Sequence, residues 1–421
     1  MTTPFTGVFR SLRGFNYRVW TAGAFVSNVG TWVQRTAQNW LVFTQLTDHD
    51  ASAVGLVMAL QFGPQLLLLP WTGFAADHFN QRRLLIATQA TMGGLALALG
   101  LLTVTGAVQL WHVYVFAFLF GGAAAFDAPV RQTFVAELVG DADLHNAVSL
   151  NSTSFNAARM IGPAAAGVVI AAIGTGWAFL INGVSFVAVL ISLTSLRLSE
   201  LRPNARARSA KGSFTEGFRY VWGRADLMMI LAILFLIGTF GLNFSIFIAT
   251  MAVGIFHADA RGYGLLSSIM AIGTVAGALM GASREKPRFS LLLVGAGAFG
   301  LGCGLAALAP NYWVFAGALV VIGAAALTLT NTTNSLMQLS TEPAMRGRVM
   351  ALRVGVALGG TPIGAPIVGW VADAFGPRWA LGVGAASGFA AAAVAIYALA
   401  RRIDRPLPRR PTAGCEGAAG D

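Results

Sequence analysis

Two arginines inside long apolar stretches are the residues of this chain best placed to do chemistry. Arg35 lies in the stretch from Trp20 to Thr44, and Arg159 in the stretch from Ala147 to Ile173. A charged side chain is costly inside a bilayer and usually faces a bundle interior or a cavity. A guanidinium there attracts carboxylate, phosphate or catecholate groups. We therefore predict a cavity for an amphipathic molecule with anionic or polar character; the alternative is that each arginine bonds to backbone carbonyls or amides and serves packing alone.

Each arginine belongs to a stripe of polar and aromatic residues at helical spacing. Residues three or four apart share one face of a helix, so each stripe would line one wall of the same cavity. Aromatic members would stack on planar rings or on a guanidinium. The predicted cavity residues are Asn28, Trp32, Arg35, Gln38, Asn39, Gln61, Gln65, Phe155, Asn156, Arg159, Asn243, Asn331 and Asn334.

Other kinds of chemistry find little support in the residue types. The cysteines, Cys303 and Cys415, lie far apart, so we expect no disulfide framework. We find no metal-ligand spacing, no phosphate-binding glycine loop and no nucleophile beside a base. The net charge of +11 could suggest nucleic acid, but the basic residues sit between apolar runs instead of on one soluble face. We expect no catalytic activity, cofactor, metal or nucleic-acid partner.

Membrane-spanning helices would position the predicted cavity. Of the 421 residues, 56% are hydrophobic and 11% charged, against roughly 25% charged in soluble domains. Because about 20 apolar residues cross a bilayer core as a helix, we predict twelve spans. They run near Trp20 to Thr44, Val54 to Phe74, Leu84 to Thr105, Val113 to Pro129, Ala147 to Ile173, Trp177 to Leu196, Met228 to Ile255, Tyr263 to Ala282, Leu291 to Ala309, Trp313 to Met337, Val349 to Val371 and Trp379 to Leu399.

The basic residues predict the orientation of these spans. With both termini in the cytoplasm, nearly all of the 28 lysines and arginines fall in cytoplasmic segments or inside spans, and only Arg261 and Arg378 fall on the other side. Cytoplasmic loops of membrane proteins carry such an excess. Arg10, Arg13 and Arg18 precede the first apolar run, and no small-residue cleavage site follows that run, so we expect a retained first span from Trp20 onward. These features predict a multi-pass protein of the plasma (inner) membrane with both termini cytoplasmic.

The chain divides into four predicted parts. Residues 1–196 form a six-helix bundle, and residues 226–403 form a second one. Between them, residues 197–225 are a basic cytoplasmic linker with an amphipathic stretch around Phe214, Phe218 and Val221, which we expect to rest on anionic headgroups. Residues 404–421, rich in proline, arginine and glycine, are expected to form a disordered cytoplasmic tail.

The two sets of six spans are related by an internal repeat. One shift superposes the ends of the two halves without a gap, and it places Gly162 on Gly364 and Gly167 on Gly369. Since six is even, both halves enter the membrane from the same side and the repeats are parallel. Parallel repeats that rock about a midplane site are typical of transporters.

The loop after the second span carries a recognisable motif. It reads Gly73-Phe-Ala-Ala-Asp77-His-Phe-Asn80-Gln-Arg82-Arg83 and resembles the loop motif of the major facilitator superfamily. Asn80 replaces the usual glycine, and asparagine tolerates a left-handed turn better than most residues. The resemblance implies that Asp77 faces the start of the eleventh span, where a helix dipole stabilises a carboxylate. It also implies that the arginines pair with an acid on the fourth span and so close a cytoplasmic gate.

Motifs in the fourth and fifth spans resemble those of one branch of this superfamily. The fourth ends in Phe126-Asp127-Ala-Pro129-Val-Arg131-Gln132, and the fifth holds Arg159-Met-Ile-Gly162-Pro163-Ala-Ala-Ala-Gly167. They resemble the macrolide and siderophore exporter branch and are similar to enterobactin exporters. Asp127 would be the acid of the gate, next to Arg131. The element of Gly162, Pro163 and Gly167 resembles one associated with antiporters, and it serves either close helix packing or a hinge.

The resemblance covers essentially the whole chain and implies a fold and an activity. The fold is an all-α integral membrane protein with twelve transmembrane helices in two parallel six-helix repeats. The activity is secondary active export of small amphipathic, drug- or siderophore-like molecules by a monomer, with protons as the coupling ion. No acid stands mid-span, and pairing of Asp127 favours a gate over a proton carrier. A proton-symport importer of an organic acid is the alternative.

Overall fold

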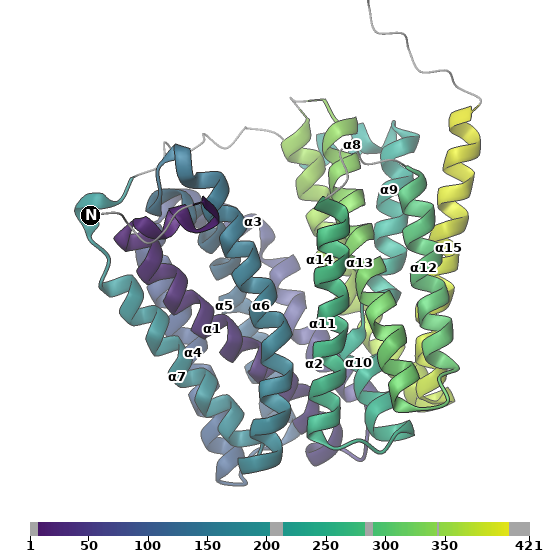
Figure 1. The fold of residues 1–421 in the computed structure, drawn as a ribbon, viewed down its shortest axis with the longest axis horizontal. Helices are drawn as coiled ribbons and strands as arrows, with labels where there is room; N and C mark the ends of the chain where they lie inside the picture. The colour runs from purple at the N-terminus through teal and green to yellow at the C-terminus, as the bar shows by residue number, and fades with distance from the viewer. Residues whose placement is uncertain (1–6, 203–213, 283–288, 343–344, 404–421) are drawn as a thin grey trace, which may run out of the picture.

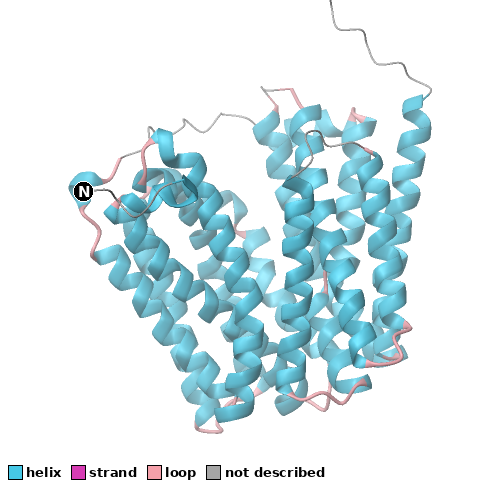
Figure 2. Ribbon diagram, in the orientation of Figure 1, coloured by secondary structure: helices cyan, strands magenta, loops and turns pink. Residues whose placement is uncertain are grey.

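The computed structural model describes residues 7–202, 214–282, 289–342 and 345–403. In these ranges the chain forms helices and connecting loops (Figure 2). Ten helical segments there are long and apolar enough to cross a membrane, and they coincide with ten of the twelve predicted spans. The first predicted span is the more polar α1 (Phe15–Leu41), and the second is divided between α2 (Ala51–Leu67) and α3 (Leu69–His78). The predicted all-α membrane fold is confirmed, and these segments are consistent with twelve crossings.

The first half of the chain forms one bundle, from purple to teal in Figure 1. Side-chain caps begin two of its helices: Asp50 accepts a hydrogen bond from the Ala53 amide at α2, and Asn80 from the Arg83 amide at α4. The remaining helices of this bundle are α4 (Gln81–Val104), α5 (Leu110–Leu138), α6 (Asp141–Ile173) and α7 (Thr175–Thr194).

The second half forms a bundle beside the first, from teal to yellow in Figure 1. In the chain the short α8 (Phe214–Trp222) comes first, and it packs on α14 and α9 of this bundle. Its Val221 is buried while Phe218 and Trp222 are exposed, as in an amphipathic helix. The helices of the second bundle are α9 (Ala225–Leu236), α10 (Phe244–Ala249), α11 (Ala260–Ala282), α12 (Ser290–Ala307), α13 (Tyr312–Ser340), α14 (Arg346–Phe375) and α15 (Pro377–Ile403).

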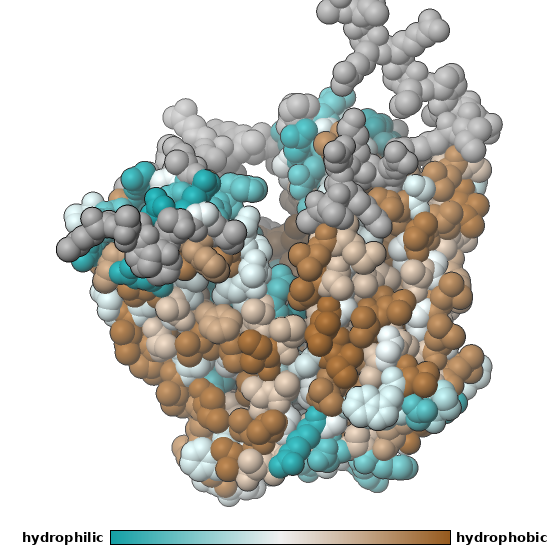
Figure 3. Space-filling model, in the orientation of Figure 1, coloured by the Kyte–Doolittle hydropathy of each residue, from teal (hydrophilic) through white to brown (hydrophobic). Residues whose placement is uncertain are grey.

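Two helix pairs join the bundles: α2 packs on α14, and α6 packs on α11. The side that carries the 3₁₀ helix Gly7–Arg13 and α8 is here called the basic side, and the opposite side the far side. At the basic side the space-filling surface is hollowed between the bundles (Figure 3). On the face shown in Figure 3, hydrophobic residues form a belt between more hydrophilic ends, which suits a bilayer.

The seventh predicted span is not one continuous α-helix. After α9 the chain passes through a π-helical segment, Ile237–Gly241, breaks at Leu242 and Asn243, and resumes as α10. Local π geometry often marks functional positions, and non-helical backbone at membrane depth is tolerated where it lines a cavity or is buried in protein. The break therefore directs attention to the space beside it.

Candidate substrate cavity

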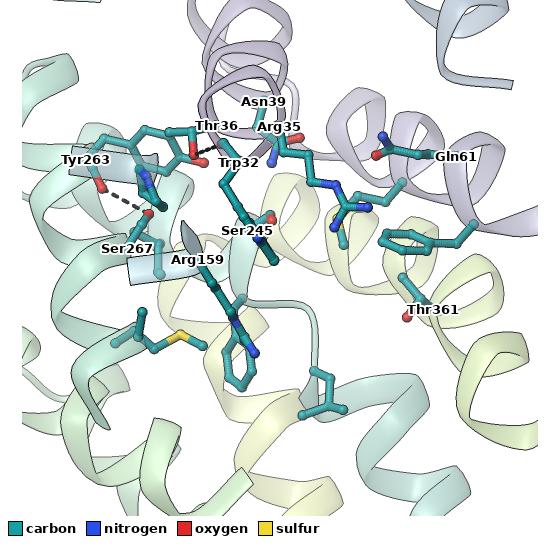
Figure 4. Close-up of a pocket in the computed structure, with 18 residues that line it drawn as sticks. Trp32, Arg35, Thr36, Asn39, Gln61, Arg159, Ser245, Tyr263, Ser267 and Thr361 are labelled. Atoms are coloured by element: carbon teal, nitrogen blue, oxygen red, sulfur yellow. Dashed lines mark hydrogen bonds between the residues drawn. The ribbon is translucent and has the colours of Figure 1, made fainter. Parts of the chain in front are cut away.

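A cavity of about 230 Å³ lies between the bundles and is lined by residues from both of them. The first bundle contributes α1, α2 and α6, and the second contributes the break before α10, α10 itself, α11 and α14. None of the lining residues comes from α4, α7, α12 or α15. The lining residues, drawn in Figure 4, are Trp32, Arg35, Thr36, Asn39, Met58, Gln61, Phe62, Arg159, Pro163, Leu242, Phe244, Ser245, Ile248, Tyr263, Ser267, Met270, Ala271 and Thr361.

Both predicted arginines reach this cavity, and they share one aromatic partner. The guanidinium carbon of Arg35 lies 5.0 Å from the centroid of the Trp32 ring and 5.6 Å from that of Phe62. The guanidinium carbon of Arg159 lies 5.5 Å from the Trp32 ring. At such distances the negative face of an aromatic ring attracts a cation. The indole of Trp32 thus holds two positive groups against one wall of the cavity.

The charge of these arginines is not balanced by a nearby acid. Neither Arg35 nor Arg159 takes part in the ion pairs found in the described residues, and no lining residue is acidic. The Nε atom of Arg35 is buried without a hydrogen-bond partner in the structure. An unsatisfied buried donor is costly, and a hydrogen bond to a charged ligand group would relieve that cost. The arrangement can therefore bind an anionic group.

The second bundle lines the cavity with neutral polar and aromatic groups. The Ser267 hydroxyl donates to the backbone carbonyl of Tyr263 at 3.0 Å (Figure 4). Tyr263 of α11 and Asn39 of α1 both line the cavity, so each bundle contributes a neutral polar side chain to its wall. The ring of Tyr263 also lies 5.8 Å from that of Trp40. One wall is therefore cationic, and the opposite wall is aromatic and weakly polar, as an amphipathic ligand requires.

The structure brings together part of the predicted cavity set. Trp32, Arg35, Asn39, Gln61 and Arg159 line the cavity. The predicted residues outside its lining are Asn28, Gln38, Gln65, Phe155, Asn156, Asn243, Asn331 and Asn334.

Local contacts account for several of the residues outside the lining. Asn28 accepts a hydrogen bond from Arg131 at 2.8 Å. Asn156 donates to a backbone carbonyl one turn earlier in α6. Asn243 donates to the carbonyl of Thr239 at 2.7 Å and so satisfies a backbone group at the helix break. Phe155 lies edge to face with Trp32, with ring centroids 6.0 Å apart, and thus supports the cavity wall from behind.

Several lining residues were not among those predicted from the sequence. Tyr263 and Ser267 stand four apart at the start of a predicted span, where a shared polar face was a usable signal. For Thr361 the internal repeat was a usable signal, because the shift that places Gly162 on Gly364 also places the predicted cavity residue Arg159 on Thr361. Phe62 and Phe244 are ordinary span residues, and nothing in their sequence positions separates them from lipid-facing phenylalanines.

Asp127 is the centre of a buried polar network on α5. Arg131 pairs with it through Nε at 3.0 Å and through a terminal nitrogen at 2.9 Å. Thr88 and Gln89 of α4 donate to its other oxygen at 2.9 and 2.6 Å. Because Arg131 also donates to Asn28, the network ties together α1, α4 and α5. The acid is paired with Arg131 on its own helix.

The described contact of Arg82 in the loop motif is not with the acid of the fourth span. Arg82 donates from Nε to the Leu193 carbonyl at the end of α7, at 2.7 Å. Arg83 is exposed. Asn80 caps α4 with an extended backbone, φ −68°, and the left-handed turn considered for it is not adopted. The surroundings of Gly73 and the side chain of Asp77 lie outside what the structure describes, so the predicted contact of Asp77 with the eleventh span stays a prediction.

The glycine–proline element packs between two helices. A Cβ on Gly162 would collide with Trp32 of α1, and a Cβ on Gly167 would come within 2.6 Å of the Ala260 carbonyl of α11. Pro163 lines the cavity between them. The element thus allows close packing at the point where α6 contacts both bundles; a hinge role stays a prediction.

The comparisons with known proteins agree with this geometry. A family model described as a transmembrane secretion effector matches residues 6–407. The chain belongs to this family of the major facilitator superfamily. The predicted membership, with its likeness to siderophore exporters, is confirmed, and the chain is a membrane transporter by family and fold.

Named relatives cover most of the chain at low identity. It is 25% identical over 361 residues to the staphyloferrin A transporter of Staphylococcus aureus, covering 84% of this chain and 89% of that one. It is 24% identical over 328 residues to the enterobactin exporter EntS of Citrobacter koseri, covering 77% and 78%. A solved bacterial homologue of the human lysosomal transporter Spinster, inward-facing and occupied, is similar in fold, with a TM-score of 0.74 at 15% identity over 96% of this chain and 100% of that one.

Proposed function

We propose that this transporter exports small amphipathic molecules that carry an anionic group, drug- or siderophore-like in size, by alternating access and at the expense of a proton gradient. The observation that carries the proposal is the pair Arg35 and Arg159, both on the ring of Trp32, in a cavity without an acidic residue in its lining. A cation-rich pocket with an aromatic wall selects an anion attached to a planar apolar body.

The direction of transport rests on the similarity to an exporter and on the sidedness of charge. The enterobactin exporter is similar along most of this chain. We assign the basic side to the cytoplasm of the plasma (inner) membrane, because arginines gather there. The hollow between the bundles then faces the cytoplasm, and an exporter loads its substrate from that side. One chain holds both bundles, so a monomer suffices.

Proton coupling is part of the proposal and needs a titrating group. Asp127 is buried but accepts hydrogen bonds from Thr88, Gln89 and Arg131. Donors from its own bundle therefore occupy both oxygens of this carboxylate. These contacts favour a structural role for Asp127 in the gate, so the proton carrier is to be sought elsewhere.

Accumulation in cells tests export. A panel of fluorescent drugs and catecholate compounds is measured in cells expressing the wild type, Arg35→Ala or Arg159→Ala, with and without a protonophore. Arg261→Ala, which removes an exposed far-side arginine, is the matched control. We expect the wild type and the control to lower accumulation of an anionic compound, and the cavity variants and the protonophore to abolish that effect. Raised accumulation by the wild type would instead indicate the proton-symport importer of an organic acid.

A further inference from the structure

The far side of the cavity is closed where α2 crosses α14. Gly55 of α2 packs on the backbone at Ala365, where a Cβ on the glycine would collide with the carbonyl. One turn further, a Cβ on Gly369 of α14 would come within 2.5 Å of the Ala51 carbonyl. The two backbones are therefore in contact over at least one turn. For the cavity to open to the far side, this crossing must separate.

The crossing of α11 and α6 is its counterpart in the internal repeat. Gly264 stands four residues after the start of α11, as Gly55 does in α2, and it packs on the carbonyl of Pro163. Gly167 faces Ala260 in the way that Gly369 faces Ala51. The far-side closure thus consists of two glycine crossings related by the repeat. A contact that is present at only one of the two crossings is therefore not a general property of the repeat.

A carboxylate marks the first crossing. Asp373, near the end of α14, accepts hydrogen bonds from the Ala51 and Ser52 amides at the start of α2, each at 2.8 Å. The Ser52 hydroxyl also bonds to it. At the second crossing the repeat places Ala171, which has no polar side chain, where Asp373 stands in the first.

These contacts are strong for a physical reason. The first amides of a helix lack partners within the helix, and the positive end of the helix dipole attracts a carboxylate. Hydrogen bonds to a charged acceptor are about twice as strong as neutral ones. Asp50 caps the same helix start but belongs to the bundle of α2, as it accepts from Ala53. Asp373 is supplied by the other bundle, and its bonds are lost when the bundles separate at this side.

We propose that Asp373 is a latch on the far-side gate, which holds the transporter with its cavity open to the basic side. The latch works through hydrogen bonds from the start of α2 to the Asp373 carboxylate. It is not a salt bridge, because Asp373 takes part in none of the ion pairs within the described ranges. It acts on the conformational equilibrium and not on the substrate. Its removal shifts the population toward the state open to the far side.

A distance measurement across the far side tests the latch without any substrate. Spin labels are placed on Thr105→Cys and Leu308→Cys, exposed positions at the far-side ends of α4 and α12, in a background with Cys415→Ser; Cys303 is buried. Double electron–electron resonance then compares the wild type, Asp373→Asn and Asp50→Asn in liposomes. Asp50→Asn is the matched control, because it removes a carboxylate from the same helix start without releasing the other bundle.

We expect Asp373→Asn to shift the distance distribution to longer values and Asp50→Asn to keep the wild-type distribution. Ser52→Ala, which removes one of the three bonds, is expected to give a smaller shift, and it keeps the test informative if Asp373→Asn folds poorly. Wild-type distributions in Asp373→Asn or, where that variant does not fold, in Ser52→Ala would overturn the proposal. An equal shift in Asp50→Asn would overturn it as well. Since no transport is measured, either outcome is independent of the proposed substrate and direction.

Discussion

The guanidinium group of Arg159, on α6, lies 5.5 Å from the indole ring of Trp32, on α1, and Arg35 approaches the same ring at 5.0 Å. Two like charges around one ring repel each other, and the cation–π attraction to the ring offsets part of that cost. A bound anion would offset more of it. Trp32 therefore lowers the cost of placing these two arginines side by side.

Replacement of Trp32 tests this dependence. Trp32 also positions both guanidinium groups at the cavity wall through cation–π contacts of about 0.5 to 2 kcal/mol each. Because Trp32→Ala releases both groups from that position, we expect it to lower ligand affinity by roughly tenfold and Trp32→Phe to retain part of it. Equilibrium binding to purified protein measures the change. Trp177→Ala, at an exposed position of α7, is the control and should bind like the wild type. Equal binding by Trp32→Ala and Trp177→Ala would show that the ring does not organise the site.

Loss of Asp127 should destabilise the first bundle. Asp127→Asn leaves Arg131 largely buried without its charged partner, and breaking a buried pair costs about 3 to 5 kcal/mol. The free energy of unfolding in mixed micelles should fall accordingly. The double variant with Arg131→Gln should recover much of the loss, because no unpaired charge remains. A single variant as stable as the wild type would mean that the network contributes little.

Close packing at Gly162 predicts a steric penalty. Gly162→Ala forces a Cβ against Trp32, and overpacking of this kind typically costs 1–3 kcal/mol, or about 2 kcal/mol here. Thermal unfolding should show a lower Tm than for Gly304→Ala in α12, where an added Cβ meets nothing within 4 Å. Identical melting of the two variants would argue against tight packing of α1 on α6.

Sidedness can be measured with single cysteines. Leu198→Cys lies on the basic side after α7, and Leu308→Cys on the far side after α12; both positions are exposed. In intact cells a membrane-impermeant maleimide should label Leu308→Cys at once and Leu198→Cys only after permeabilisation. The reverse pattern would place the basic side outside and invert the proposed direction of loading.

The sequence predicts the fold well because lipid imposes strong rules. Spans must be long and apolar, so hydropathy found the second bundle and most of the first. The same logic located Arg35 and Arg159, since a charge inside a span is rare and needs a reason. The exceptions are physical too: α1 carries polar residues along its length, and the second span is interrupted at Leu68.

The cavity itself was less predictable from the sequence. Polarity alone could not separate Asn39, which lines the cavity, from Asn243, which hydrogen-bonds to a backbone carbonyl at a helix break. The π-helical segment before the break packs against α14, where Gly360 and Gly364 approach the backbone of Gly238 and Thr239. Such contacts form between spans that are far apart in the chain, so they cannot be predicted from the sequence of one span alone.

Ligand preference of the purified protein tests the central claim most directly. Equilibrium dialysis would compare a panel of aromatic carboxylates with their neutral carboxamides, for the wild type and for the Arg35→Ala, Arg159→Ala double variant. Because a hydrogen bond to a charged group contributes about 1.5 to 3 kcal/mol, we predict that the wild type prefers a carboxylate by roughly tenfold or more and that the double variant has no preference. A wild type that binds carboxamides as well as carboxylates, or a double variant that keeps the preference, would contradict an anion-binding cavity built on Arg35 and Arg159.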